Sequence, residues 1–289
     1  MWDFSGDEVV FLLVAGAVAL IATIKWYYAI ARTKILRASS ARLLLAIIPP
    51  VLLIVLLIVL QTIADPEWVV GRLDYTLLFT AGGIAWMFVA ASAFAWLGVS
   101  AQDDALERGN VAAGLTIAGG MVGVMLAYAG SNVGNGPTIW TTLLPAFVAA
   151  ISLLITWGLL ESVTDTAEAI TVERDTATGI RVGVYVACVG AVFGRAMAGD
   201  FDTLAGYTGT LADFARLAWP AVALVPVMVV LHHVMRPSPT RPTPSIVVAG
   251  YIPAAALVAL TLVYIVSLGR PYVAPAGEYD KPAAVEKER

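Results

Sequence analysis

Cysteine and charged residues are scarce in this sequence. The single cysteine, Cys188, lies inside an apolar block, so the chain can form neither an intramolecular disulfide nor a cysteine-based metal site. Only 13% of the 289 residues are charged and 60% are apolar, whereas typical soluble domains are about 25% charged. The net charge of -4 is small, and no basic stripe carries interleaved aromatics. The sequence therefore predicts no nucleic-acid partner.

Catalytic motifs are also missing. The sequence contains no His-Glu-x-x-His string, no Walker loop, no dinucleotide fingerprint and no recognisable Ser/His/Asp set. The two histidines, His232 and His233, are adjacent and would point about 100° apart on a helix, so one metal or haem could not readily use both. A zinc site that combines one of them with distant carboxylates is the alternative left open. We predict a protein that is not an enzyme and holds no cofactor or metal.

Long apolar runs are what the sequence has in abundance. They are about 20 residues long, which as a helix matches the hydrocarbon core of a bilayer, and the mean hydropathy is +0.84. Lipid offers the backbone no hydrogen-bond partners, so each run must satisfy its own backbone as a helix. We predict an all-α membrane protein with eight transmembrane helices, at residues 9–31, 43–63, 75–99, 111–130, 138–160, 177–198, 217–235 and 245–268.

The distribution of basic residues predicts the orientation. Arg32, Lys34, Arg37 and Arg42 lie in or beside the first connection, whereas the acidic segment before the first helix has no basic residue. Cytoplasmic loops carry the excess of Lys and Arg, so this connection is placed in the cytoplasm and both termini outside it. The basic residues of the C-terminal tail would then lie outside, which argues against this orientation. The acidic start also predicts that no signal peptide is cleaved.

Two internal repeats are visible. A shift of 204 positions places Ile48-Pro49 on Ile252-Pro253 and Arg32 on Arg236. Chance matching of Ala, Leu and Val in apolar segments is the alternative. In the middle of the chain, Asn110–Gly114 is echoed by Asp175–Gly179.

The repeats predict how the chain is divided. Each repeating unit is a two-helix hairpin, so its copies would enter the membrane in the same sense, as four like-oriented hairpins. The predicted units are an N-terminal hairpin at 1–66, a four-helix unit at 67–204, a C-terminal hairpin at 205–270 that is related to the first, and a disordered tail at 271–289.

The four-helix unit carries a recognisable set of residues. These are an acidic loop, the Asn110–Gly114 string opening a Gly-rich helix, Trp140 near the start of the next helix, and the Asp175–Gly179 echo opening the last. The set resembles the domain-of-unknown-function 350 (YjfL-like) family of bacterial inner-membrane proteins, which are four-helix units. The resemblance implies a bacterial inner-membrane location and lends no catalytic residue. Asp175 departs from the Asn often found there, and the outer hairpins lie beyond one unit.

Acidic and amide side chains gather at the predicted cytoplasmic mouths of two helices. One interpretation is structural, because Asn110 and Asp175 directly precede apolar helices and are typical N-caps. The other is a solute-binding vestibule that concentrates cations. Its candidate residues are Asp103, Asp104, Glu107, Asn110, Glu173 and Asp175.

Small residues and two arginines mark the helices that begin at these mouths. Small residues four apart allow two backbones to approach closely, and they predict helix packing through Gly114, Gly119, Gly123, Gly179 and Gly183. A narrow solute path between the two helices is the alternative. Arg181 and Arg195 lie 14 positions apart and share a face within roughly 40°. They either snorkel to water or face inward to bind an anion or a headgroup.

Two functional hypotheses follow. The first is passage or sensing of a small cationic solute, which the acidic loops favour. The second is a structural subunit that organises lipid or a partner protein, which the absence of carboxylates deep in the membrane favours. The expected partners are membrane lipid and either a second copy of the chain or another membrane protein.

Overall fold

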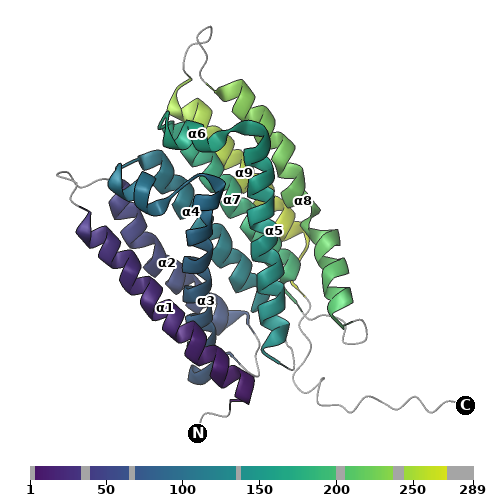
Figure 1. Cartoon of the computed structure of the whole chain (residues 1–289). Helices are drawn as coiled ribbons and strands as arrows, with labels where there is room; N and C mark the ends of the chain where they lie inside the picture. Colours follow the sequence, from purple (N-terminus) through teal and green to yellow (C-terminus); the bar gives the residue numbers. More distant parts are fainter. Residues whose placement is uncertain are drawn as a thin grey trace, which may run out of the picture.

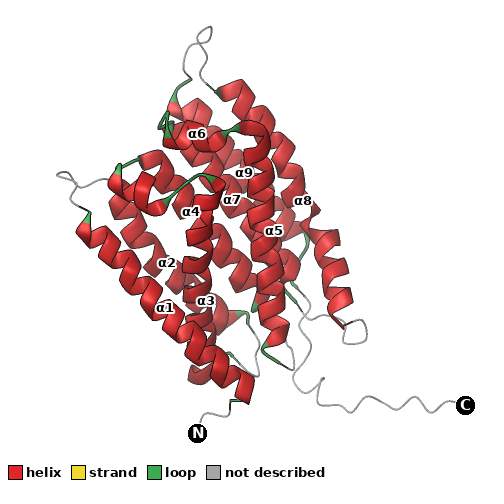
Figure 2. Cartoon of the chain, in the orientation of Figure 1, coloured by secondary structure: helices red, strands yellow, loops and turns green. Residues whose placement is uncertain are grey.

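The computed structural model describes residues 4–33, 40–64, 69–134, 138–199, 206–236 and 244–271, and these ranges contain helices and no strand (Figure 2). The longer helices are α1 (Gly6–Arg32), α2 (Ser40–Thr62), α3 (Leu73–Ala93), α4 (Val111–Ser131), α5 (Trp140–Thr164), α7 (Thr176–Met197), α8 (Gly206–Met235) and α9 (Ile252–Ser267). The shorter ones are η1 (Phe94–Leu97), η2 (Ala101–Glu107), α6 (Thr166–Thr171) and η3 (Val247–Tyr251).

The eight predicted spans are confirmed in number and order. Within the described ranges, eight helices are long and apolar enough to cross a membrane, as expected of a multi-pass membrane protein. Most boundaries agree with the sequence to within a few residues. The exception is α8, which starts at Gly206 and not near 217, because its first turns carry Asp213 and Arg216 and do not register as an apolar run.

Four short helices lie outside the predicted spans or interrupt them. The 3-10 helix η1 forms the end of the span predicted at 75–99. The acidic stretch expected to be a loop is the π-helix η2, and α6 follows α5 after the left-handed residue Asp165 (φ 53°). The start of the last span is the π-helix η3, which precedes Pro253. The length of an apolar run indicates a membrane span, but it does not indicate short polar helices or a change in helical pitch.

The core of the bundle is the pair α4 and α7. The buried share of the apolar window is 83% for α7 and 72% for α4, against 11% for α1 and 17% for α8. Figure 1 shows α1, α2 and α3 on one side of this pair and α5, α8 and α9 on the other. On the first side α2 packs against α4, and on the second α9 packs against α7. The outer faces of α1 and α8 remain apolar and exposed, which fits contact with lipid.

Contacts between helix ends show which ends lie together. Arg236 at the end of α8 is paired with Glu173, which precedes α7, whereas the Val133 carbonyl after α4 accepts from the Gly199 N–H after α7. Successive spans therefore run in opposite directions, and α4 and α7 run parallel. We call the end with Asn110 and Asp175 the capped end, and the end with Val133 and Gly199 the opposite end.

The same turn leads into both central helices. Gly109 (φ 61°) and Arg174 (φ 57°) are left-handed residues directly before the N-caps of α4 and α7. In each case the cap N–H bonds to a carbonyl six residues earlier, Asn110 to Asp104 at 3.2 Å and Asp175 to Ala169 at 2.9 Å. This bond spans one residue more than the Schellman bond that typically closes a helix with a left-handed terminal residue. Each short helix thus ends where the cap of the next helix begins.

The predicted hairpins and repeats stay predictions. The most extensive contact of α1 is with α3 and not with its sequence neighbour α2. Lys34 and Arg37, on which the orientation partly depends, lie outside the described residues, as does most of the predicted tail.

Candidate functional site

Glycines bring the backbones of α4 and α7 into contact. A methyl carbon added at Gly119 would lie 2.1 Å from the carbonyl oxygen of Gly183, and one at Gly190 would lie 2.1 Å from that of Gly123. The same holds near both ends of the pair, where Gly179 meets Ala112 and Gly130 meets Gly194. We call this contact the α4–α7 seam. Such close approach requires glycine, because any side chain would collide with backbone.

The contacts at the seam bear on the two interpretations of the small residues, which are helix packing and a narrow solute path. Gly119, Gly123, Gly179 and Gly183 all face the partner backbone, so packing accounts for them. Gly114 differs, because a methyl carbon there would meet Ala41 of α2 at 2.8 Å. The spacing identifies residues that allow close packing but does not identify the helix that packs there. The contact runs along both helices, from Ala112 and Gly179 to Gly130 and Gly194.

The acidic residues of η2 are bonded within their own turn. Asp104 is buried, accepts the Ser100 N–H at 2.8 Å and pairs with Arg108 at 3.0 Å. Asp103 is exposed and accepts from the Ser100 hydroxyl at 3.0 Å. Glu107 is exposed and accepts from the Gln102 amide at 3.2 Å. These bonds stabilise the short helix without excluding a ligand at the exposed oxygens.

Asn110 and Asp175 are the N-caps of α4 and α7. The Asn110 side-chain oxygen accepts the N–H groups of Ala112 and Ala113, and its amide donates to the Ile170 carbonyl of α6 at 2.7 Å. Asp175 accepts the N–H groups of Ala177 and Thr178 and also the Thr178 hydroxyl at 2.5 Å. Asn suits the first position because a carboxylate could not also donate to a carbonyl.

Glu173 binds the end of another helix. Its carboxylate pairs with Arg236 at 2.9 Å, and this hydrogen bond raises the pKa of the Arg236 guanidinium above its ordinary value. Of the six solute-site candidates, Asp103, Glu107 and Glu173 are exposed. The structure therefore places all six at the capped end, each already holding an intramolecular partner.

The two arginines of α7 bind backbone carbonyls at the two ends of the last span, which consists of η3 and α9. Arg181, which is 1% exposed, donates to the Ala249 carbonyl near the start of α9 and to the Thr178 hydroxyl at 2.8 Å. Arg195 donates to the Gly269 carbonyl just beyond the end of α9 at 3.0 Å. The 14-residue spacing thus places both on the face covered by α9. Arg181 points into the bundle, whereas Arg195 is partly exposed at the opposite end.

The carbonyl that Arg181 binds lies in η3, four residues before Pro253. In an α-helical register the Ala249 carbonyl would accept the N–H of residue 253, which Pro253 lacks, whereas η3 has the wider π-helical register. The guanidinium supplies this carbonyl with a side-chain donor. A buried carbonyl without a donor is costly, so Arg181 has a structural reason to lie inside the bundle.

Two aromatic side chains likewise donate to carbonyls that lie one turn before the prolines of α2. Pro49 and Pro50 remove the donors of Leu45 and Ala46, four residues earlier. The Trp26 indole donates to the Leu45 carbonyl at 3.0 Å, and the Tyr27 hydroxyl donates to the Ala46 carbonyl at 3.0 Å. Side chains from α1 thereby supply donors to the carbonyls one turn before Pro49 and Pro50 of α2.

The two histidines have different surroundings, as their adjacency on a helix requires. His233 is exposed and its Nδ1 lies 2.8 Å from the Val229 carbonyl. His232 is 2% exposed, and neither ring nitrogen has a hydrogen-bond partner. No group of three or more His, Cys, Asp or Glu side chains that could hold a metal ion occurs in the described residues.

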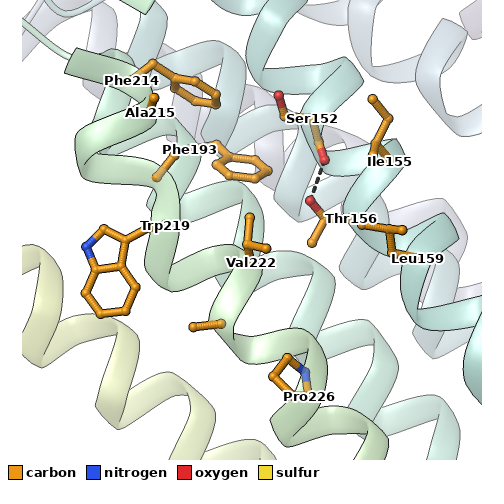
Figure 3. Close-up of a pocket in the computed structure, with 12 residues that line it drawn as sticks. Ser152, Ile155, Thr156, Leu159, Phe193, Phe214, Ala215, Trp219, Val222 and Pro226 are labelled. Carbon is orange, nitrogen blue, oxygen red and sulfur yellow. Dashed lines mark hydrogen bonds between the residues drawn. The ribbon is translucent and has the colours of Figure 1, made fainter. Parts of the chain in front are cut away.

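An open groove of about 740 Å³ lies between α5 and α8, and α7 contributes Phe193 (Figure 3). The sequence did not reveal this groove, because its two walls come from helices that are not consecutive in the chain. The α5 wall consists of Ser152, Ile155, Thr156 and Leu159, which share one helix face. The α8 wall includes Ala215, Ala218, Trp219, Val222, Ala223 and Pro226. The only hydrogen bond drawn in Figure 3 joins the Thr156 hydroxyl to the Ser152 carbonyl at 2.6 Å.

Comparison with known proteins identifies the central part of the chain. Neither the curated proteins nor the solved structures contain a match. A family model, described as Domain of Unknown Function (DUF350), matches residues 67–197. The match covers less than half of the chain and includes α3, α5 and both helices of the seam. The match to the family model and the resemblance carried by the sequence therefore fall on the same segment, residues 67–197.

Proposed function

We propose that the protein is a non-enzymatic membrane-organising subunit, which binds lipid in the plane of the membrane and does not pass a solute across it. The observation that carries this proposal is the α4–α7 seam. These two helices begin at the acidic mouths and would have to line a path for a cation. Their backbones instead touch at both ends and in the middle.

The polar groups at the capped end support the same proposal. A cation path needs carboxylates that can exchange their partners for the solute along its length. Asp104 and Asp175 are held by caps and ion pairs, and the exposed Asp103, Glu107 and Glu173 lie at the end of the bundle and not along a span. The open groove between α5 and α8 is lined mostly by apolar atoms, which suits lipid better than a cation.

Reconstituted flux tests this proposal. We expect proteoliposomes that contain the protein to take up Na⁺, K⁺ and methylammonium no faster than protein-free vesicles, because the backbones of α4 and α7 are in contact along the seam. The comparison variant carries Glu107→Gln, Glu173→Gln and Asp175→Asn, which keeps a capping side chain at position 175. Uptake by the wild type above that of empty vesicles would contradict the proposal. Loss of that uptake in the triple variant would then identify the acidic end as the solute site.

We also propose that the protein lies in the bacterial inner membrane with the capped end in the cytoplasm. Arg108, Arg174 and Arg236 all lie at this end, which supports the orientation by the excess of basic residues in cytoplasmic loops. Both termini would then lie outside the cytoplasm.

Thiol labelling tests the orientation. In a Cys188→Ala background, we expect Thr138→Cys, exposed at the opposite end, to react with a membrane-impermeant maleimide in spheroplasts. Gln102→Cys, exposed at the capped end, should react only after the membrane is permeabilised. The reverse pattern would invert the orientation.

A further inference from the structure

We propose that the groove between α5 and α8 binds one acyl chain of an anionic phospholipid, whose phosphate is held by Arg216. This inference rests on the proposed function and deepens it, because it names the lipid class and the place where it binds. It concerns a surface that faces the membrane and not the acidic capped end.

The shape of the groove fits a chain and not a compact ligand. Its α8 wall extends from Phe214 to Pro226, a rise of about 18 Å at 1.5 Å per residue. This length exceeds half of the roughly 30 Å hydrocarbon core. The volume of about 740 Å³ is enough for a chain, since small-molecule sites span roughly 300 to 1,000 Å³.

The lining offers a chain apolar contact and few polar groups. The α8 wall is lined by small side chains, those of Ala215, Ala218 and Ala223. The rings of Phe193 and Phe214 pack together, with their centroids 5.4 Å apart. The buried Thr156 hydroxyl already donates to the Ser152 carbonyl. A polar solute would therefore find little to bind, whereas an acyl chain exchanges one apolar surrounding for another and is held by van der Waals packing against the groove.

A charged residue stands near one end of this groove. Arg216 is exposed and lies between the wall residues Ala215 and Ala218 in sequence. Side chains on a helix lean toward its N-terminus, so the guanidinium is directed to the membrane surface at which α8 begins. Trp219, 61% exposed, lies one turn further along, which suits an aromatic near the interface.

The charge selects the headgroup. Arg216 makes no ion pair within the described part of the chain, although the exposed Asp213 lies one turn before it. A guanidinium binds phosphate with two parallel hydrogen bonds. A zwitterionic headgroup would present its own cation beside Arg216, whereas phosphatidylglycerol would not, so we expect the anionic lipid to be preferred.

Lipid retention in mixed vesicles tests the inference. The purified full chain is reconstituted in equal amounts of phosphatidylglycerol and phosphatidylcholine, re-extracted in mild detergent, and its bound lipid is measured by native mass spectrometry. We expect one retained phospholipid per chain, with phosphatidylglycerol preferred about fivefold, the upper range for an exposed ion pair. Equal retention of the two lipids would overturn the headgroup assignment, and no retained lipid would overturn the site.

Matched variants separate the two parts of the site. Ala223→Phe fills the groove at an exposed wall residue and should abolish retention, whereas Ala259→Phe on the exposed face of α9 should not change it. Arg216→Gln should keep a bound lipid but lose the preference, and Arg216→Lys should restore most of it. Protection of the buried Cys188 thiol confirms that each variant is folded.

This result is independent of the flux measurement. Absence of flux together with absence of retained lipid would remove the acyl-chain site and leave only the non-transporting part of the proposed function. Flux by the wild type would remove the proposed function even if lipid were retained. Retention that is unchanged by Ala223→Phe would place the lipid elsewhere and contradict the inference.

Discussion

Gly119→Ala should lower the free energy of unfolding of the protein by about 3 kcal/mol or more. The added methyl carbon would lie 2.1 Å from the carbonyl oxygen and 2.4 Å from the Cα of Gly183, and neither atom can rotate away. The two central helices must separate to make room. Overpacking of a well-filled core costs about 1 to 3 kcal/mol when side chains can adjust. We expect a loss at or above the upper end of this range.

Heating in detergent while following the reaction of the Cys188 thiol measures this loss. Cys188 is buried, so its reactivity reports opening of the bundle. Gly16→Ala on α1 is the matched control, because nothing lies within 4 Å of the added carbon there. The control should be neutral or stabilised by up to about 1 kcal/mol through better helix propensity. Equal midpoints for the two variants would show that the seam is not close-packed.

Arg181→Met should loosen α9 from α7 and lower stability by about 2 kcal/mol. The substitution keeps the apolar stem but removes the guanidinium donor to the Ala249 carbonyl, to which Pro253 cannot donate. A buried acceptor left without a donor costs about 1 to 3 kcal/mol. Removal of a buried charge offsets part of this cost, so the single variant alone does not isolate the hydrogen bond.

A double-mutant cycle isolates it. Pro253→Ala restores an N–H at the position that would bond to Ala249 in a regular helix. In the Pro253→Ala background, the loss of unfolding free energy caused by Arg181→Met should be smaller by about 1 kcal/mol, because the Ala249 carbonyl has a second donor. Thr116→Val with Pro253→Ala is the control pair, since Thr116 donates to carbonyls of α4 and α7 and not to α9. Equal costs of Arg181→Met in both backgrounds would contradict the assigned role.

The membrane helices could be predicted from the sequence because the bilayer imposes a simple rule on length and polarity. The caps Asn110 and Asp175 followed from their positions before apolar runs, and the spacing of Gly119 and Gly123 indicated a close helix contact. These signals are local. They depend on residues within one helix or at its boundary, which a single sequence contains in full.

The partners of these residues could not be predicted in the same way. Nothing near Gly114 in sequence indicates that it faces Ala41 of α2, and the role of Arg181 depends on Pro253 more than 70 positions away. The groove is hidden for the same reason, since its walls come from α5 and α8. Such contacts are set by tertiary packing, which apolar periodicity does not encode.

A cryo-EM map of the protein in a lipid nanodisc, at a resolution that shows side chains, tests the absence of a path most directly. We expect the backbones of α4 and α7 to touch at Gly119–Gly183 and at Gly123–Gly190, with no water density between them. A hydrated gap that separates these glycines and runs from Asn110 to Ser131 would contradict the non-transporting function.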